Sequence, residues 1–471
     1  MAIQPQFART KDDAAVKRVC DALADRFGDR FTTGQALREQ HGHTTTSMKN
    51  QIPDGVVFAQ SSEDVSEVVK LCHSHDVPVI PFGTGSSLEG HLNAPYGGIS
   101  IDLARMNAIV DVQAEDLTCT VQAGVTREML NSYLRDTGLF FPIDPGADAS
   151  IGGMAATRAS GTNAVRYGTM KDNVVCLKAV MPDGQIITTA SRAKKSSAGY
   201  DLTRLLVGSE GTLGIITEVT LKLSGIPQSV TGGICNFPDL ESACNAVILT
   251  IQCGIPVARI ELLDELQVKA CNGYSKLDLA ERPTLLVEFH GTEGSVAEQV
   301  ELFSDIVNDC GGSDFRWASK AEERNKLWTA RHNAYWAAHE LRPGAKGLST
   351  DACVPISRLA ECVAETQKDI EETGFIAPVV GHVGDGNFHV LLLLDPDSAE
   401  EQAKAETFLG RLAHRAIAMG GTCTGEHGIG QGKMKYMVEE YGPALTYMAA
   451  IKQAIDPKNI MNPGKILPSV D

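Results

Sequence analysis

The chain has 471 residues, of which 43% are hydrophobic, and this is enough to bury the cores of two or three globular domains. Its formal net charge of −17 and its lack of a long Lys/Arg run argue against nucleic acid or an anionic membrane surface as a partner. No stretch approaches the roughly 18 to 20 consecutive apolar residues that a membrane span requires, so we expect none.

The cysteines and the first residues bear on the cellular compartment. The 12 cysteines are scattered and never form C-x-x-C, which is typical of a reducing compartment and not of a disulfide framework or a thiolate zinc site. The N-terminus lacks an apolar core and becomes acidic quickly, unlike secretory or organellar presequences. We therefore expect a cytoplasmic protein.

The first half of the chain, about residues 50–222, has an α+β pattern. Short β-rich runs alternate there with Gly-rich loops and helical stretches. The clearest runs are 77–81, 99–103 and 118–121, and the clearest helix is 62–73. Residues 174–181 and 185–189 flank the turn Pro182-Asp183-Gly184 and should form a hairpin.

A second region begins after the break at Gly225-Ile226-Pro227. Its strand candidates are 284–289 and 388–394, and its helix candidates are 240–252, 295–309 and 356–372. This pattern predicts an antiparallel sheet with helices on one side. The last 45 residues or so are expected to be helical, and we place domain boundaries after residues 225 and 425.

Three glycine-rich segments stand out in the first half. The loop 81–87, Pro-Phe-Gly-Thr-Gly-Ser-Ser, follows a strand and could turn consecutive backbone N–H groups toward phosphate oxygens. It matches neither a P-loop nor a dinucleotide-binding G-x-G-x-x-G that opens a long helix. Residues 142–168 and 208–217 are also punctuated by glycine, and together the three segments favour a bound cofactor over three structural turns.

The stretch 379–391 predicts a metal site across a hairpin. A four-residue turn at 384–387 would pair Val383 with Phe388 and place His382 opposite His389. Paired positions have Cβ atoms about 4.5 to 5.5 Å apart, so both imidazoles could reach one cation. Glu426, in a glycine-flanked loop with His427, is the third candidate ligand. Two imidazoles and a carboxylate suit zinc, manganese or iron, and the sequence does not choose among them.

In their order and spacing, the glycine-rich segments resemble the FAD-binding domain of vanillyl-alcohol-oxidase type flavoproteins. Residues 50–467 resemble the group of FAD-linked D-lactate dehydrogenases (cytochrome type), glycolate oxidase catalytic subunits and D-2-hydroxyglutarate dehydrogenases, and D-lactate dehydrogenases most of all. The resemblance implies an α+β fold with a two-subdomain FAD-binding domain at 1–225. A substrate (cap) domain would follow at 226–425, with its antiparallel sheet flanked by helices, and residues 426–471 would return to the FAD domain.

The same resemblance implies a set of FAD contacts. The pyrophosphate would be held by Gly83, Thr84, Gly85, Ser86 and Ser87. The ribityl and isoalloxazine parts would be flanked by Pro145, Gly146, Ser150, Gly152, Gly153, Gly161 and Tyr167, and Ile216 would contact the adenine side. Further expected contacts are Pro81, Glu210, Gly214 and Asn462. Some relatives attach FAD through a histidine in the first loop, but that stretch here is Thr-Gly-Ser-Ser, so we expect non-covalent FAD.

The resemblance also assigns the chemistry. His382, His389 and Glu426 fall where the group has its metal ligands, and His427 falls where it has its catalytic base. Arg331 can grip a substrate carboxylate through two hydrogen bonds. Taken alone, Arg331 would more often form a structural salt bridge, and the family's Trp-x-x-Arg segment favours the substrate role. The expected reaction is the oxidation of a short D-2-hydroxy acid, D-lactate to pyruvate.

Several alternatives stay open. Glycolate, D-2-hydroxyglutarate or another D-2-hydroxy acid could be the substrate, and Lys346 is a candidate cation for a second carboxylate. The electron acceptor could be a cytochrome, a quinone or an electron-transfer flavoprotein, and a homodimer is possible. The metal ligands alone would also suit a metal-dependent hydrolase. A catalytically silent flavin-binding subunit is the remaining interpretation.

Overall fold

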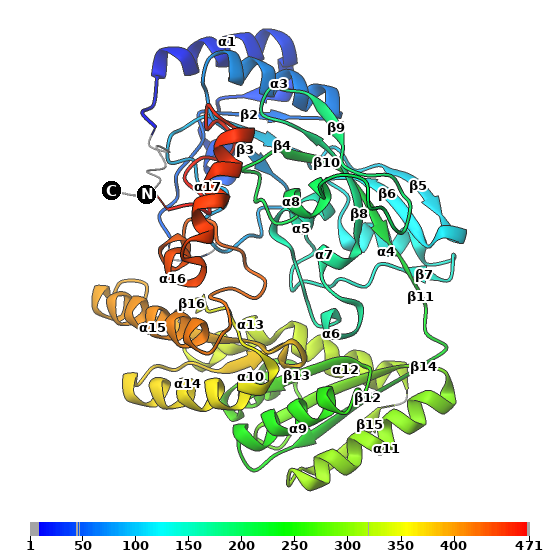
Figure 1. The fold of residues 1–471 in the computed structure, drawn as a ribbon. Helices are drawn as coiled ribbons and strands as arrows, with labels where there is room; N and C mark the ends of the chain where they lie inside the picture. Colours follow the sequence, from blue (N-terminus) through cyan, green and yellow to red (C-terminus); the bar gives the residue numbers. More distant parts are fainter. Residues whose placement is uncertain (1–8, 44–45, 47, 319, 469–471) are drawn as a thin grey trace. The chain divides into compact units, whose positions relative to one another are not determined.

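The computed structural model describes residues 9–43, 46, 48–318 and 320–468 (Figure 1). Two compact units divide the chain. The first consists of Met1–Ser160, Thr169–Gly225 and Glu426–Asp471, and the second consists of Gly161–Gly168 and Ile226–Gly425. The chain therefore enters the second unit twice. Among the described residues, no helix is both long and apolar enough to cross a membrane.

The first sheet of the first unit has the strand order β1-β2-β4-β3. Its strands are β1 (Phe31–Thr32), β2 (Gly55–Phe58), β4 (Ile99–Asp102) and β3 (Val79–Phe82), and the last three are parallel. Helices α1 (Asp13–Phe27) and α3 (Ser62–Ser74) bury valines and leucines against this sheet, and α2 (Gln35–His41) follows β1. The β3 strand leads directly into the first glycine-rich loop.

The second sheet of this unit is antiparallel, in the order β5-β6-β10-β8-β9. Its strands are β5 (Ile109–Gln113), β6 (Thr118–Gln122), β10 (Ile215–Lys222), β8 (Val174–Val180) and β9 (Ile186–Thr188). The predicted hairpin is confirmed by β8 and β9, with Gly184 in the left-handed region at φ 81°. Its core also takes side chains from α4 (Arg127–Leu134), α5 (Ile151–Thr157), α7 (Met170–Asn173) and α8 (Leu202–Leu206). The short strands β7 (Leu139–Phe140) and β11 (Ser224–Gly225) pair with each other.

The C-terminal segment completes the first unit (Figure 1). It contains α16 (Met437–Tyr441) and α17 (Ala444–Ile455), and irregular chain surrounds them. The expectation that the last 45 residues or so are helical, with a terminal Asn462-Pro463-Gly464-Lys465, is therefore only partly right. After α17, Met461 forms a parallel bridge with Val79 of β3, and both residues are fully buried. The end of the chain thus contributes to the core that the first strands build.

The second unit contains an antiparallel sheet of eight strands in the order β15-β12-β14-β13-β18-β19-β16, with β17 also paired to β19. The strands are β15 (Ser313–Ala318), β12 (Ser229–Asn236), β14 (Thr284–Gly291), β13 (Val257–Leu263), β18 (Val379–Gly381), β19 (Asn387–Leu394), β16 (Lys346–Ser349) and β17 (Ala352–Cys353). The short α6 (Ala164–Tyr167) belongs to this unit and contacts β13.

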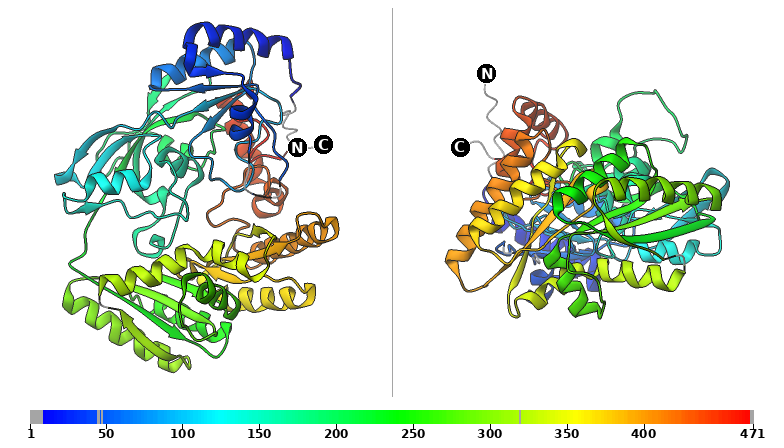
Figure 2. Two further views of the ribbon diagram at one scale, coloured as in Figure 1. Left: turned by 180° about the vertical axis from the view of Figure 1, so that it is seen from behind. Right: turned by 90° about the horizontal axis from the view of Figure 1, so that it is seen from below.

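Helices cover both faces of this sheet, so the prediction of helices on one side only is wrong (Figures 1 and 2). Neighbouring residues on a strand point to opposite faces. Leu262 belongs to one core with α9 (Leu240–Gln252), α11 (Glu293–Asp309), α14 (Leu359–Thr373) and α15 (Ala399–Ala418). Leu263 belongs to another core with α10 (Glu265–Ser275), α12 (Ala321–His332) and α13 (Ala334–Ala338). The end of β13 thus buries an apolar side chain on each face, so both faces need a covering layer.

Candidate active site

The β18–β19 hairpin carries the two predicted histidine ligands, but its register differs from the prediction. Val380 pairs with His389 and Val379 with Val390, so the expected pairing of His382 with His389 and of Val383 with Phe388 is wrong by two residues. The strand ends at Gly381, and a 3₁₀ turn at Val383–Asp385 lengthens the connection. A shift of two residues keeps side chains on the same face. The imidazole rings of His382 and His389 still lie together, with centroids 5.5 Å apart.

Both imidazoles are held through Nδ1. His382 Nδ1 lies 2.8 Å from Glu261 Oε1, and His389 Nδ1 lies 2.9 Å from the backbone oxygen of Thr350. An ionised carboxylate and a carbonyl oxygen only accept hydrogen bonds, so Nδ1 carries the proton in each ring. The lone pair of each neutral ring is then on Nε2, the form in which histidine binds a cation.

Glu426 follows directly on Gly425, the last residue of the second unit. Glu426, His382 and His389 each offer one ligand atom, and these atoms all lie within 4.8 Å of one another. The structure therefore brings together the three predicted ligands. Two imidazole nitrogens and a carboxylate oxygen form a donor set that suits zinc, manganese or iron.

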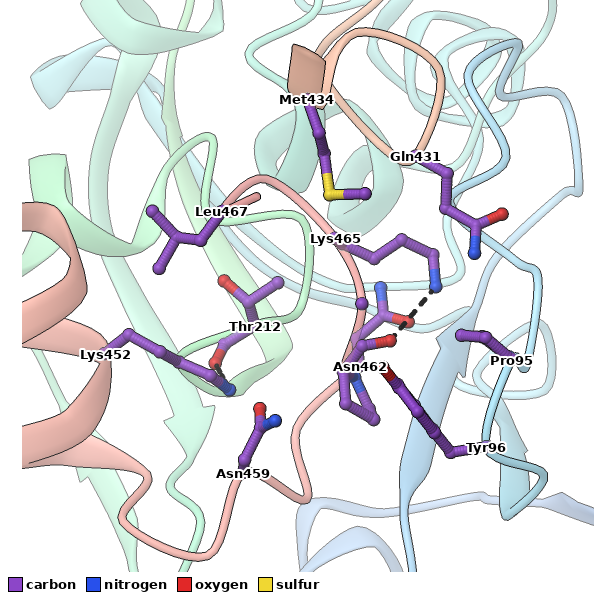
Figure 3. A pocket seen from close by; sticks show the side chains of 12 residues that line it. Pro95, Tyr96, Thr212, Gln431, Met434, Lys452, Asn459, Asn462, Lys465 and Leu467 are labelled. Carbon is purple, nitrogen blue, oxygen red and sulfur yellow. Dashed lines mark hydrogen bonds between the residues drawn. The ribbon is translucent and has the colours of Figure 1, made fainter. Parts of the chain in front are cut away.

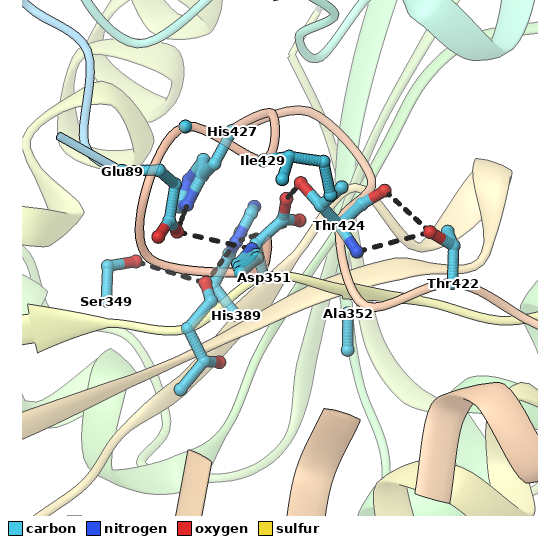
Figure 4. Close-up of polar contacts among 12 residues, drawn as sticks. Glu89, Ser349, Asp351, Ala352, His389, Thr422, Thr424, His427 and Ile429 are labelled. Carbon is cyan, nitrogen blue, oxygen red and sulfur yellow. Dashed lines mark hydrogen bonds and ion pairs between the residues drawn. The ribbon is translucent and has the colours of Figure 1, made fainter. Parts of the chain in front are cut away.

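Asp351 anchors the loop that leads to Glu426 (Figure 4). Its carboxylate is buried and accepts hydrogen bonds from Thr424 Oγ1 and Asn387 Nδ2, both at 2.7 Å. Thr422 and Cys353 exchange two backbone hydrogen bonds, at 2.8 and 3.3 Å. These contacts fix residues 421–425 against β17 and β19.

His427 lies in the first unit beside Glu89, a residue that was not among the predicted site residues (Figure 4). His427 Nδ1 is 3.9 Å from Glu89 Oε1, and Lys433 Nζ is 3.3 Å from the same oxygen. The chain passes Glu89 so closely that a Cβ on Gly430 would lie 2.1 Å from the Glu89 backbone oxygen. Gly430 also has φ 48°, a conformation that favours glycine.

Arg331, the predicted carboxylate-binding residue, forms a buried ion pair on the sheet. Its Nε and Nη2 atoms lie 2.8 and 2.6 Å from Glu261 Oε2. Neither contact uses Nη1. Burial alone would raise the pKa of Glu261, but His382 and Arg331 outweigh burial and lower this pKa. Lys346, the other candidate cation, is exposed on the edge strand β16.

A second buried carboxylate, Glu288 on β14, has a similar set of contacts. Glu288 Oε1 lies 2.8 Å from His290 Nε2, and Glu288 Oε2 accepts a hydrogen bond from Trp328 Nε1 at 2.7 Å. His290 Nδ1 is in turn 2.7 Å from the Tyr167 hydroxyl. Burial would raise the pKa of Glu288, but His290 and Arg259 lower it. Tyr167, predicted to flank the flavin, thus belongs to a hydrogen-bonded chain inside the second unit.

Glu261 and Glu288 were not predicted, although the sequence contains a signal for both. Each acidic residue stands inside an apolar strand, where burial of a charge requires partners. The partners of Glu261 lie 70 and 121 residues away along the chain, so they could not be predicted from the sequence of the strand.

The three glycine-rich segments meet in the first unit. A Cβ on Gly83 would lie 2.3 Å from Ser150 Oγ, and a Cβ on Gly211 would lie 2.4 Å from Pro81 Cγ. The first loop therefore touches both other segments, as a shared binding role requires. Gly85 has φ 75° in the middle of this loop. Of the expected FAD contacts, only Gly161 and Tyr167 belong to the second unit.

Glu210 and Asn462, two expected FAD contacts, link the third glycine-rich segment to the C-terminal segment. The Glu210 carboxylate accepts hydrogen bonds from the backbone N–H groups of Ile429 and Gly430, at 2.7 and 2.8 Å, and lies 3.2 Å from His91 Nε2. Asn462 Nδ2 donates to the Glu210 backbone oxygen at 2.8 Å. The Glu210 side chain is thus engaged by protein.

Asn462 also lines a cavity of about 160 Å³ in the first unit (Figure 3). Its Oδ1 atom is buried and accepts no hydrogen bond from the described part of the chain. Lys465 lines the same cavity and donates to the Asn93 backbone oxygen at 2.7 Å. Burial lowers the pKa of this lysine to about 7.

Known protein families match both halves of the chain. Residues 53–190 match the family described as FAD binding domain, and residues 226–466 match the family described as FAD linked oxidases, C-terminal domain. The chain is 52% identical over 459 residues to the probable mitochondrial D-lactate dehydrogenase of Danio rerio, covering 96% of this chain and 92% of the relative. The chain belongs to the family of FAD-linked oxidases.

A second member of the family, the mitochondrial D-lactate dehydrogenase [cytochrome] of Arabidopsis thaliana, is 47% identical over 455 residues, covering 96% of this chain and 80% of the relative. A solved structure of p-cresol methylhydroxylase has a TM-score of 0.81 at 18% identity and covers 97% of both chains. The predicted fold class, with an FAD-binding domain of the vanillyl-alcohol-oxidase type and a cap domain, is confirmed. This family member is an oxidoreductase, and the hydrolase interpretation is set aside.

Proposed function

We propose that the protein is an FAD- and divalent-metal-dependent dehydrogenase of short D-2-hydroxy acids, converting D-lactate to pyruvate. The observation that carries this proposal is the cluster of His382, His389 and Glu426 in a chain that also has an FAD-binding domain. The names of the relatives from Danio rerio and Arabidopsis thaliana support D-lactate as the substrate. The first unit would bind FAD, and the second would act as the substrate domain.

The residues of the first unit fit FAD. The loop of Gly83 to Ser87 presents backbone and small hydroxyl side chains, and the other glycine-rich segments converge on it. The unsatisfied Asn462 Oδ1 supplies a further polar contact of the kind that a cofactor completes. His91, the histidine nearest to the loop in sequence, is buried beside Glu210, which supports non-covalent attachment.

The residues of the candidate metal cluster fit a divalent cation. Both imidazoles carry the Nδ1 proton and so present Nε2, and Glu426 adds a carboxylate. Three protein ligands leave coordination positions open, as catalytic metal sites do. Zinc, manganese and iron all accept this donor set.

The proposed mechanism divides the work among side chains of this chain. When bound, FAD supplies the acceptor of a hydride, and the cation supplies Lewis acidity at the substrate hydroxyl. His427 would act as general base and take the hydroxyl proton, with Glu89 beside its Nδ1. Arg331 would bind the substrate carboxylate through Nη1, since Glu261 already holds Nε and Nη2.

The acceptor and compartment are also proposals. A cytochrome is our preferred acceptor because the name of the Arabidopsis thaliana relative includes one, and a quinone or an electron-transfer flavoprotein remain alternatives. Both relatives are named as mitochondrial, so the cytoplasmic location stays a prediction that these names do not support. Homodimer formation stays a prediction as well.

Anaerobic flavin reduction tests the proposed function. D-lactate should bleach the flavin absorbance of the purified protein, while L-lactate should not, and glycolate and D-2-hydroxyglutarate should be slower. Removing the metal with a chelator should abolish bleaching, and adding zinc or manganese should restore it. A flavoprotein that no D-2-hydroxy acid reduces would instead fit a silent flavin-binding subunit, and unchanged bleaching after metal removal would contradict the metal role.

A further inference from the structure

Glu261 occupies a central position on the sheet of the second unit. Its side chain has no exposed surface, and each carboxylate oxygen has a different partner. Oε1 accepts from His382 Nδ1 at 2.8 Å, and Oε2 accepts from Arg331 Nε at 2.8 Å. The extended register of β13 and β18, in which Leu262 pairs with Gly381, places Glu261 opposite His382. One buried carboxylate therefore contacts both a candidate metal ligand and the candidate substrate cation.

Helix α12 reaches two such carboxylates from one face. Trp328 and Arg331 are three residues apart, which puts them on the same side of the helix. Trp328 binds Glu288 and Arg331 binds Glu261, and each carboxylate gives its other oxygen to a histidine. Both carboxylates are buried, both contact α12, and both contact a histidine. They differ in that only the histidine of Glu261 belongs to the candidate metal cluster.

We propose that Glu261 is a positioning residue that sets the tautomer of His382 and the orientation of Arg331 at the same time. This inference rests on the proposed function, because it assumes that His382 binds the metal and that Arg331 binds the substrate carboxylate. By accepting the Nδ1 proton, Glu261 directs the lone pair of His382 to Nε2. By accepting from Nε and Nη2, Glu261 fixes the plane of the Arg331 guanidinium and leaves Nη1 for the substrate carboxylate.

Replacing Glu261 with glutamine keeps the volume of the side chain nearly constant but changes its hydrogen-bonding groups. An amide has one acceptor oxygen and one donor NH₂ group, so it cannot accept from both His382 and Arg331. If the oxygen faces Arg331, the NH₂ group faces His382 Nδ1 and stabilises the tautomer protonated on Nε2, which cannot bind a cation. If the oxygen faces His382, the NH₂ group faces Arg331, which then loses its acceptor.

The decisive experiment measures metal affinity. FAD-loaded, metal-free Glu261→Gln protein is titrated with Zn²⁺ and with Mn²⁺ in competition with a chromophoric chelator. We expect affinity to fall about 10- to 100-fold relative to the wild type, the usual effect of losing the carboxylate behind a histidine ligand. KM for D-lactate, measured at saturating metal, should rise more than kcat falls. Flavin absorbance and the thermal unfolding midpoint report whether the variant is folded.

Glu288→Gln is the matched control. It makes the same change in a second buried carboxylate that also contacts α12, through Trp328, so it reproduces any general loosening of the sheet. Its metal affinity should stay close to the wild-type value. Wild-type affinity in Glu261→Gln, or an equal loss in Glu288→Gln, would overturn the proposal. If Glu261→Gln does not fold, Glu261→Asp decides, because its shorter side chain cannot reach both partners and must also weaken binding.

A failure of the proposed function gives a different pattern. His382→Ala removes a candidate ligand directly. If the wild type binds no stoichiometric metal, or if His382→Ala binds it equally well, the metal site itself is wrong. If His382→Ala loses the metal while Glu261→Gln keeps it, only the role of Glu261 is wrong.

Discussion

At the scale of single residues, His427 combines a proposed role with a defined surrounding. Its side chain is 10% exposed, and its Nδ1 lies 3.9 Å from Glu89 Oε1. Its neighbour Glu426 is a candidate metal ligand, and both residues lie in a bend of the chain outside any helix or strand. A base and a ligand can therefore come from one short loop. Family resemblance predicts the base, and the structure adds the Glu89 carboxylate as a charged neighbour of its ring.

Replacing His427 with asparagine should lower kcat for D-lactate by about 10²- to 10⁴-fold, the usual contribution of a general base. KM should change little, because the carboxylate is bound elsewhere, by Arg331. Steady-state kinetics with an artificial electron acceptor measures both parameters. His414→Asn, an exposed histidine on α15, makes the same change outside the site and should keep wild-type kcat. A kcat within a few-fold of the wild type in His427→Asn would exclude the role of base.

At the scale of elements, the β18–β19 connection determines where the histidine ligands lie. Gly386 ends the 3₁₀ turn with φ 76°, and a Cβ there would lie 2.0 Å from the Val354 backbone oxygen. Val354 N also donates to the Gly386 backbone oxygen at 3.0 Å. The turn and Val354, the residue that follows β17, are therefore packed backbone to backbone, so the turn cannot accommodate a side chain without moving His382 or β19.

Gly386→Ala should accordingly lower both the thermal unfolding midpoint and the metal affinity. The left-handed conformation alone costs an alanine about 1 to 2 kcal/mol, and the clash with a backbone oxygen adds to this. Gly374→Ala provides the comparison, because Gly374 has φ 71° but no heavy atom of the described residues within 4 Å of the position that a methyl group would take. The Gly386 variant should unfold at a lower temperature than the Gly374 variant. Equal midpoints would show that the turn can move away from Val354.

Local signals in the sequence predicted helices and strand faces, but not contacts between distant elements. Helix Leu240–Gln252 was predicted with its observed bounds, since its apolar spacing and its Asp239 cap are local signals. Histidine proximity was predicted as well, because face alternation survives a shift of two residues. The register of the β18–β19 pair was predicted wrongly. His382 leaves the extended conformation, at φ −82° and ψ 64°, because of tertiary contacts. Glu261 was missed for a related reason, since its partners come from distant elements.

At the scale of the whole molecule, the cysteines give a test of the redox state. All 12 cysteines lie within the described residues, where none forms a disulfide, and of them only Cys253 is exposed. Burial raises the pKa of the Cys119 and Cys244 thiols to about 12, so few of these thiols are ionised near neutral pH. The thiolate is the reactive form.

We expect a thiol reagent such as DTNB to modify one group rapidly in the native protein and all 12 after unfolding without reductant. Cys253→Ser should remove the rapid phase and leave the slow one. A total well below the cysteine count in the unfolded, unreduced protein would reveal disulfides and argue against a reducing compartment.

The junction between Met461 and β3 has a consequence for biosynthesis. Val79 N donates to the Ile460 backbone oxygen and Asn462 N donates to the Val79 backbone oxygen, both at 2.8 Å, so the first core contains residues that are translated after the whole of the second unit. The ribosome releases every residue of the second unit before these arrive. Units tend to fold as soon as they have emerged. The second unit can therefore fold on the nascent chain before residues 460–462 emerge and complete the support of β3 and the loop that follows it.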